Sequence, residues 1–272
     1  YAKNKLKNIF FFSFVSRLSQ AENLMKIISL AFLIFLLNIC AFGQNQPIVV
    51  YLSGDSTMAE KRPEKRPETG WGEMFQKYFD AEKVKIENHA QNGRSTRTFI
   101  SENRWQTIVD KLKKGDYVFI QFGHNDQSKE KVDRYTPPED YRKNLIRFVE
   151  DVRAKRANPI LLTPVMRRKF DAEGKFVDQH GVYPAIVRDV AKEYKVPMID
   201  MHRTSEKLLV KYGVEDSKKL FLQIKAGEHP NYPNGVNDNT HFVPPGAEEM
   251  AKLAVEGIKE RKLGLRRYLK KH

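Results

Sequence analysis

Short apolar runs alternate with longer amphipathic segments along the chain from residue 48 onward. Two of these runs, residues 48–53 and 117–122, are almost wholly apolar, which is typical of central strands buried on both faces. Strands that alternate with helices at this spacing predict βαβ units and therefore a parallel sheet. The predicted strands are residues 48–53, 84–88, 116–122, 159–163 and 197–200, and the predicted helices are residues 71–79, 101–113, 138–156, 183–195 and 246–261.

Residues 44–272 contain no repeat of domain size and no linker, so the sequence predicts one three-layer α/β domain there. The tetrapeptide Lys-Arg-Pro-Glu occurs twice in succession at residues 61–68, and its prolines predict a basic loop. Two longer stretches, residues 167–181 and 213–237, are predicted to be irregular, the first with a small hairpin around Glu173. Long loops in compact domains are often functional.

Residues 25–43 have the features of a secretory signal peptide: a basic start, an apolar core and a small-x-small cleavage pattern. We therefore expect residues 1–24 to be an upstream or gene-model extension, and the mature chain to be secreted or periplasmic without membrane attachment. The alternative is an uncleaved membrane anchor, but the apolar stretch 27–42 has 16 residues, short of the ~20 that a spanning helix needs. A lipoprotein is disfavoured because Ile39, and not a small residue, precedes Cys40.

The composition excludes several classes of protein and indicates the kind of partner. The 272 residues are 40% hydrophobic and include one Cys, which excludes an intrachain disulfide, a thiol redox pair and a zinc ribbon. The formal net charge is +14, and because residues 1–43 hold five basic residues and one acidic residue, the rest of the chain carries +10. Such a surplus attracts nucleic acid, anionic lipid or acidic polysaccharide. The alternative is a basic surface without a partner.

Polar residues with catalytic potential follow three of the predicted strands and precede the last predicted helix. They occupy residues 54–57, 88–95, 123–126 and 238–241. Ligands of an open parallel sheet bind beyond the carboxyl ends of its strands. We therefore expect these four segments to meet on one rim, although they are spread over nearly 190 residues.

Ser56 is the candidate nucleophile, because Gly54 permits a tight strand exit that exposes the hydroxyl at the start of a helix. A serine hydroxyl needs a base to remove its proton, and His241 is the candidate base. Asp238, three residues earlier, would orient the imidazole and stabilise the imidazolium. Structural alternatives stay open: Asp55 or Ser56 could cap a helix, and Asp238 could form an ordinary turn.

Asn125 and Gly93 are the candidate donors to an oxyanion. Asn125 offers a side-chain amide, and Gly93 a backbone N–H that no side chain shields. Removing one such donor typically lowers a rate ~10²–10³-fold. Both residue types also stabilise loops, which is the alternative. The neighbouring His124 and Asp126 are expected to be structural.

Taken in order, the four segments resemble the sequence blocks of the GDSL or SGNH hydrolase superfamily, in which Ser, Gly, Asn and His are invariant. Within it the chain is most similar to the rhamnogalacturonan acetylesterase family of carbohydrate esterases. The resemblance extends over residues 48–260, with one departure at Asn92, where many relatives have Gly. It is carried by Gly-Asp-Ser-Thr-Met at 54–58, Asn-Gly-Arg-Ser-Thr-Arg-Thr-Phe at 92–99, Phe-Gly-His-Asn-Asp at 122–126 and Asp-Asn-Thr-His-Phe at 238–242.

The resemblance implies a flavodoxin-like α/β/α sandwich with a five-stranded parallel sheet, and hydrolysis of O-acetyl esters on plant cell-wall polysaccharide. It implies that Ser56 attacks the acetyl carbonyl, while His241, held by Asp238, takes the proton and returns it to the departing sugar hydroxyl. The N–H groups of Ser56 and Gly93 and the Asn125 amide would hold the oxyanion, and water would release acetate from the acyl-serine. No metal or organic cofactor is implied, and the sequence has neither a His-Glu-x-x-His zinc motif nor a Gly-x-Ser-x-Gly elbow.

Basic residues on the predicted rim suggest an acidic polysaccharide as partner, since pectic galacturonates carry carboxylates. The alternative is a set of solvated loops, because exposed charge pairs contribute only ~0–1 kcal/mol each. Two other functions stay open: an esterase for xylan acetyl groups or lipid esters, and a non-catalytic polyanion-binding module. Charged rim loops disfavour lipid, an export signal disfavours nucleic acid, and we expect a monomer. The substrate-binding candidates are Lys61, Arg62, Arg94, Arg97 and Arg167, with Lys65, Arg66 and Arg168 on the same loops.

Overall fold

The computed structural model describes residues 25–26, 29 and 46–271. Pro47 and the residues after it form one compact unit. The predicted extension at residues 1–24 and signal peptide at residues 25–43 fall almost wholly outside the described residues and stay predictions. Within the described part of the chain, no helix combines the length and apolarity needed to cross a bilayer.

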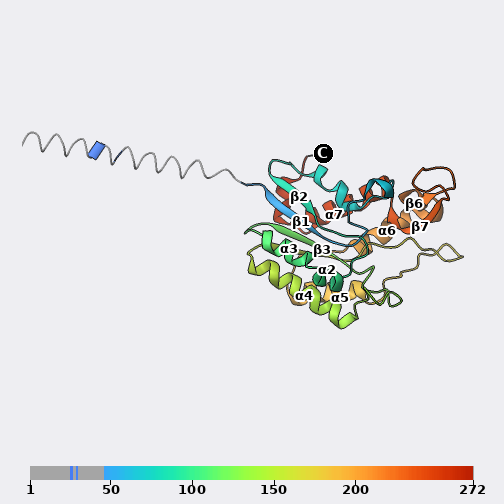
Figure 1. The fold of residues 1–272 in the computed structure, drawn as a ribbon, viewed down its shortest axis with the longest axis horizontal. Helices are drawn as coiled ribbons and strands as arrows, with labels where there is room; N and C mark the ends of the chain where they lie inside the picture. The colour runs from blue at the N-terminus through green and yellow to red at the C-terminus, as the bar shows by residue number, and fades with distance from the viewer. Residues whose placement is uncertain (1–24, 27–28, 30–45, 272) are drawn as a thin grey trace, which may run out of the picture. The chain divides into compact units, whose positions relative to one another are not determined.

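Five parallel strands form the central sheet in the order β2-β1-β3-β4-β5. The first three of them are labelled next to one another in Figure 1. The apolar runs lie at its centre, where Leu52 of β1 and Phe119 of β3 are fully buried. This is the strand order of a flavodoxin-like, doubly wound sheet, so the predicted fold class is confirmed. The strands are β1 (Ile48–Gly54), β2 (Val84–Asn88), β3 (Tyr117–Gln121), β4 (Asn158–Leu162) and β5 (Met198–Ile199).

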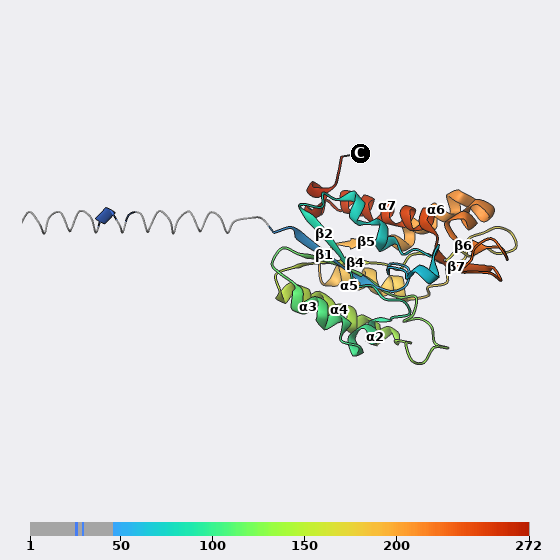
Figure 2. The same ribbon diagram turned by 45° about the horizontal axis from the view of Figure 1, so that its top comes forward.

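Helices cover both faces of the sheet and complete three layers (Figure 2). One face packs around Trp105 and Phe148, and the other around Trp71, Phe75 and Met250. The first face is covered by α2 (Thr96–Ser101), α3 (Arg104–Lys111), α4 (Pro138–Ala154) and α5 (Tyr183–Glu193). The second is covered by α6 (Met201–Asp216), α7 (Pro244–Glu260) and the 3₁₀ helices η2 (Trp71–Met74), η3 (Gln76–Tyr78) and η5 (Gly264–Tyr268).

Residues 71–79 form the two short 3₁₀ helices η2 and η3 in place of the predicted regular helix. This segment packs closely against the turn after β1, where the backbone N–H of Trp71 donates to the Thr57 carbonyl at 3.0 Å. A Cβ at Gly72 would lie 2.5 Å from the Met58 carbonyl oxygen, so the close approach requires glycine. The prediction of a regular helix was wrong because tertiary packing overrides the amphipathic pattern there.

Two other predicted segments also differ from the structure. The helix predicted over residues 101–113 is divided, because Asn103 adopts a left-handed conformation (φ 56°) between α2 and α3. The sequence pattern did not indicate α6, whose C-terminal end falls in the segment 213–237 that was predicted to be irregular. The expected hairpin around Glu173 is present as an antiparallel bridge between Phe170 and Phe176.

A two-stranded antiparallel sheet outside the main sheet was also missed. It consists of β6 (Phe221–Ile224) and β7 (Val236–Phe242). β6 is only four residues long, and β7 is mostly polar and only partly buried, so neither gives the apolar run or the alternation that indicates a strand. The pair matters for function because β7 carries Asp238 and His241. The remaining short helices are η1 (Pro63–Lys65) and η4 (Ser217–Leu220).

Candidate active site

The turn after β1 carries Ser56. Gly54 pairs with Gln121 at the end of β3, and a Cβ at Gly54 would lie 2.8 Å from the Gln121 carbonyl oxygen. The carboxylate of Asp55 accepts hydrogen bonds from the Thr57 N–H and hydroxyl at 2.9 and 2.8 Å. Asp55 therefore stabilises a short turn, and the expected helix start at Ser56 is wrong because no regular helix follows.

His241 and Asp238 both come from β7, far along the chain from Ser56. His241 contacts the turn that carries Ser56, and Asp238 contacts His241. Ser56 Oγ is 2.8 Å from His241 Nε2, and His241 Nδ1 is 2.6 Å from Asp238 Oδ2. The other carboxylate oxygen of Asp238 accepts from the N–H groups of Thr240 and His241 at 2.6 and 3.0 Å.

The charge on Asp238 sets the tautomer of His241. Burial favours a higher pKa for Asp238, but its hydrogen bonds with His241 and Thr240 outweigh burial and hold that pKa at about 2. An ionised carboxylate only accepts hydrogen bonds, so a neutral His241 carries its proton on Nδ1. Nε2 is then free to accept the proton of the Ser56 hydroxyl.

Gly93 and Asn125 line the same cavity as Ser56, a space of about 300 Å³. Gly93 has φ +74°, and a Cβ there would lie 2.9 Å from Arg134 Nη1, so both backbone and space favour glycine. Asn125 donates one of its two amide hydrogens to the Arg94 carbonyl at 3.1 Å. The fold thus brings together all five residues predicted for catalysis and oxyanion binding, and their roles stay predictions.

Lys61 does not lie exposed on the rim, contrary to the expectation for a substrate-binding residue. Its side chain has no exposed surface, and its ammonium lies 2.9 Å from the Glu68 carboxylate. The same ammonium donates to the Ser56 carbonyl and, at 2.7 Å, to Asn92 Oδ1. Burial lowers the pKa of Lys61, while the Glu68 carboxylate opposes this shift. Lys61 therefore connects the nucleophile turn to the loop of Gly93 instead of presenting its charge to solvent.

The other four candidate substrate-binding residues occupy different positions. Arg167 lines the cavity and donates to a neighbouring hydroxyl at 2.6 Å. Arg94 pairs with Glu102 at 3.0 Å, and Arg97 donates to a backbone carbonyl. The side chain of Arg62 is 80% exposed. Of the five candidates only Arg167 lines the cavity, and substrate contact by any of them stays a prediction.

Several cavity residues were not predicted. Lys131 and Arg134 come from the charged connection between β3 and α4, and Glu68 lies 4.0 Å from His241 Nε2. The sequence could have indicated Lys131 and Arg134, because the long connection that carries them directly follows Asn125 at the end of a strand. The full lining is Ser56, Lys65, Glu68, Asn92, Gly93, His124, Asn125, Ser128, Lys131, Arg134, Arg167, Thr240 and His241.

A buried row of polar side chains adjoins the nucleophile turn. Asp55 Oδ2 is 3.1 Å from His124 Nδ1, and His124 Nε2 is 3.3 Å from His180 Nε2. Burial lowers the pKa of His124 and lowers that of His180 to about 3, so both rings are neutral near pH 7. Burial opposes ionisation of Asp55, but its bonds with His124 and Thr57 hold its pKa at about 2.

His180 also belongs to a second cluster. Among the described residues, Asp178, His180 and His202 are the one group of three or more side chains that could hold a metal ion. No zinc motif in the sequence reveals this group, because His202 lies in the first turn of α6 while the other two residues lie on the loop before α5.

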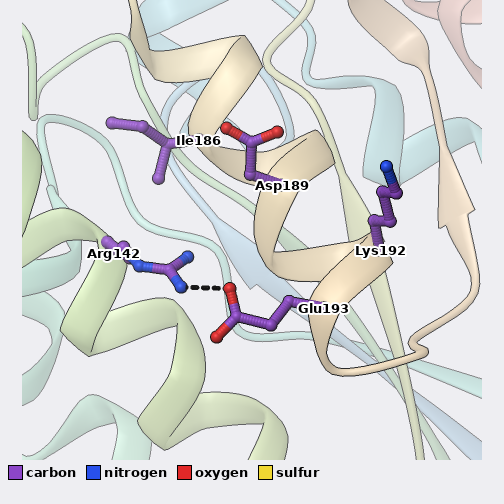
Figure 3. Close-up of a pocket in the computed structure, with 5 residues that line it drawn as sticks. All are labelled: Arg142, Ile186, Asp189, Lys192 and Glu193. Atoms are coloured by element: carbon purple, nitrogen blue, oxygen red, sulfur yellow. Dashed lines mark hydrogen bonds and ion pairs between the residues drawn. The ribbon is translucent and has the colours of Figure 1, made fainter.

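A hollow of about 520 Å³ lies between α4 and α5 (Figure 3). Arg142 and Glu193 form an ion pair across it. Its lining, completed by Ile186, Asp189 and Lys192, offers no hydroxyl, thiol or imidazole. The cavity at Ser56 is therefore the better candidate for an active site.

A three-layer α/β fold with a serine, an imidazole and a carboxylate in mutual contact is an arrangement of the hydrolase class. Residues 52–233 match the model of the GDSL-like lipase/acylhydrolase family. The chain belongs to this family, and its predicted class, carboxylic ester hydrolase, is confirmed.

Two individual proteins to which the chain is similar are both named as rhamnogalacturonan acetylesterases, one of them as probable. The chain is 43% identical over 224 residues to rhamnogalacturonan acetylesterase RhgT of Bacillus subtilis (strain 168), a match covering 82% of this chain and 95% of that protein. It is 37% identical over 217 residues to the probable rhamnogalacturonan acetylesterase YesY of the same strain, covering 79% and 94%. The predicted resemblance to this esterase family is confirmed.

Solved structures show the same fold. The YxiM protein of Bacillus subtilis superposes with a TM-score of 0.68 at 26% identity, over 80% of this chain and 58% of that protein. The acetylxylan esterase Axe2 of Geobacillus stearothermophilus superposes with a TM-score of 0.55 at 17% identity, over 79% and 96%.

Proposed function

We propose that this protein is a secreted serine esterase that removes O-acetyl groups from pectic polysaccharide. The observation that carries the proposal is the contact series from Ser56 Oγ through His241 to Asp238, with distances of 2.8 and 2.6 Å, at a cavity that Gly93 and Asn125 also line. The substrate class is supported by the names of RhgT and YesY.

In the acylation step, His241 Nε2 takes the proton of Ser56 as Oγ attacks the acetyl carbonyl carbon. The N–H groups of Ser56 and Gly93 and the Asn125 amide donate to the developing oxyanion. The ionised Asp238 stabilises the imidazolium, which then protonates the departing sugar oxygen. The sugar hydroxyl leaves, and the acetyl group stays on Ser56.

In the deacylation step, a water molecule gives a proton to His241 Nε2 and attacks the acetyl-serine carbonyl. The same donors hold the second oxyanion. Its collapse releases acetic acid, which ionises in solution, and returns the proton to Ser56 Oγ. The net reaction converts one ester and one water into a sugar hydroxyl and acetate.

Two variants test this assignment. Ser56→Ala should abolish acetate release while thermal unfolding stays like that of the wild type. Asp238→Asn should lower kcat ~10²–10⁴-fold, because the amide can donate to His241 Nδ1 and so force the proton onto Nε2. Acetate release at wild-type rate by Ser56→Ala would exclude Ser56 as the nucleophile.

A substrate panel separates the candidate functions. We expect the highest kcat/KM on acetylated rhamnogalacturonan, a lower value on acetylated xylan, and measurable turnover of 4-nitrophenyl acetate. Preference for xylan would favour the acetylxylan esterase alternative, to which only the fold likeness with Axe2 points. A non-catalytic polyanion-binding module would release no acetate that depends on Ser56.

We further infer export through residues 25–43, with no membrane attachment afterwards, no nucleic-acid partner and a monomeric mature chain. No cofactor enters the proposed steps. N-terminal sequencing of the exported protein should give Gln44 first, and light scattering should give the monomer mass. A mature chain that begins at or before Met25 would contradict the signal-peptide assignment.

A further inference from the structure

We propose that Asp178, His180 and His202 form a binding site for a divalent transition-metal ion such as Zn²⁺. One ligand atom from each residue lies within 4.8 Å of the other two. Two imidazole nitrogens with a carboxylate oxygen form a donor set that suits Zn²⁺, whereas Mg²⁺ and Ca²⁺ prefer oxygen ligands. The site is distinct from the esterase residues and does not depend on the function proposed for them.

The hydrogen-bond directions along His124 and His180 favour a cation between His180 and Asp178. Because Asp55 accepts only, a neutral His124 donates to it from Nδ1 and accepts at Nε2. His180 Nε2, 3.3 Å from that acceptor, must therefore carry the proton of the His180 ring. His180 Nδ1 is left with a lone pair that faces Asp178 Oδ1 at 3.3 Å.

Two acceptors at this separation repel each other unless a positive charge lies between them. Asp178 Oδ1 accepts the backbone N–H of His180 at 2.8 Å and keeps a second lone pair for such a charge. A metal ion binds the lone pair and the carboxylate together and leaves the ring neutral. Asp178, 44% exposed, gives the ion a path from solvent.

The third ligand atom, His202 Nε2, is buried and has no hydrogen-bond partner among the described residues. It lies 3.2 Å from Asp178 Oδ2 without hydrogen-bond alignment, in a residue that is 6% exposed. Arg188 Nη2 lies 3.3 Å from His202 Nδ1 and can only donate to it, so coordination through Nε2 would move the ring proton to Nδ1 and break that hydrogen bond. Arg188 keeps its two bonds to Asp200, at 2.9 and 3.0 Å.

The ion would orient groups beyond its own ligands. Coordination fixes the His180 tautomer, and the ring then donates from Nε2 to His124, which in turn donates to Asp55 beside the nucleophile. It also connects the loop before α5 to the first turn of α6. The expected role is therefore stabilisation of this part of the fold, with no step of ester hydrolysis assigned to the metal.

The test uses the tag-free full chain after treatment with a chelator. Zn²⁺ titrated by calorimetry should bind at one ion per chain, and Co²⁺ should give the visible absorption of a four-coordinate site. At a Zn²⁺ concentration ~100 times Kd, the Tm should rise by about 5–10 °C. Absence of saturable Zn²⁺ binding would overturn the proposal.

Variants connect the binding to these residues. Asp178→Asn, at a partly exposed position, and His202→Gln should each weaken Zn²⁺ binding at least ~10-fold and remove most of the rise in Tm. His229→Gln, which changes a histidine outside the group, is the control and should bind as the wild type does. If His202→Gln fails to fold, Asp178→Asn decides alone. Zn²⁺ binding that Asp178→Asn leaves unchanged would place the ion elsewhere and refute the site.

Discussion

At the scale of single residues, the Lys61 ammonium holds the candidate site together through three acceptors: the Ser56 carbonyl, Asn92 Oδ1 and the Glu68 carboxylate. Lys61→Met would leave Glu68, 11% exposed, without its partner. We predict a loss of about 3–5 kcal/mol in the free energy of unfolding, because an unpaired buried charge is costly. Urea unfolding at unchanged m-value measures the loss.

The next residue in the chain supplies the control. Arg62→Met removes a cation whose side chain is 80% exposed, and should change the stability by less than about 0.5 kcal/mol. The double variant Lys61→Met, Glu68→Gln should regain part of the loss, since it removes both charges. A loss for Lys61→Met no larger than that for Arg62→Met would contradict the role given to the ammonium.

The same residues show what the sequence could not distinguish. The two copies of Lys-Arg-Pro-Glu are identical in sequence, yet Lys61 of the first copy and Glu68 of the second are buried. Lys65 and Glu64, at the matching positions, are exposed. Composition predicts a solvated basic loop for all eight residues. Only the approach of Ser56 and Asn92 to one side of this loop selects Lys61, and that approach depends on tertiary structure.

At the scale of elements, the predictions succeeded where local pattern decides the structure. The strands β1 and β3 have almost continuous apolar runs, and α4 and α7 have long amphipathic repeats with prolines at their starts. The predictions failed for η2 and η3, where packing decides, and for β6 and β7, which are respectively only four residues long and mostly polar.

Asp126 connects two of these elements, and its raised pKa predicts that the stability of the fold depends on pH. Its Oδ1 accepts from the Thr96 N–H and hydroxyl, at 2.9 and 2.6 Å, and so joins the exit of β3 to the first residue of α2. Burial raises the pKa of Asp126 to about 7. Between pH ~4 and ~7 the folded protein therefore retains a proton that the unfolded chain has lost.

More bound protons in the folded state mean that the contribution of Asp126 to stability falls as pH rises from about 4 to 7, and stays low above that range. Asp126→Asn removes this titration. We expect the stability of Asp126→Asn minus that of the wild type to be more positive at pH 8 than at pH 5, by on the order of a few kcal/mol. Denaturant unfolding of both proteins at the two pH values measures it. An equal difference at pH 5 and pH 8 would show that Asp126 does not titrate in this range.

At the scale of the whole molecule, sheet topology explains why a site spread over nearly 190 residues could be proposed from sequence. Ser56, Gly93 and Asn125 follow the parallel strands β1, β2 and β3, whose carboxyl ends share one edge. That rule does not cover Asp238 and His241, because β7 lies outside the main sheet. They were predicted from the Asp-x-x-His spacing before the last predicted helix, and the order of the four segments, which resembles that of the family, supported the prediction.

The positive charge at the cavity predicts that salt weakens the binding of an acidic polymer. Four cations line the cavity: Lys65, Lys131, Arg134 and Arg167. Raising the salt concentration from ~0.1 to ~1 M shortens the Debye length from about 10 to about 3 Å. The KM for acetylated rhamnogalacturonan should therefore rise severalfold, while kcat/KM for neutral 4-nitrophenyl acetate should change less than about twofold.

A matched pair of lysines on one loop separates cavity charge from overall charge. Lys131 lines the cavity and Lys129 does not, although both are exposed. An interaction worth up to about 1 kcal/mol corresponds to an effect of about fivefold. Lys131→Gln should thus lower kcat/KM on the polymer about three- to fivefold at low salt, and Lys129→Gln should leave it near the wild-type value. Equal losses for the two variants would mean that overall charge, and not the charge at the cavity, attracts the polymer. Equal salt sensitivity of the polymer and the small ester would mean that the basic surface takes no part in substrate binding.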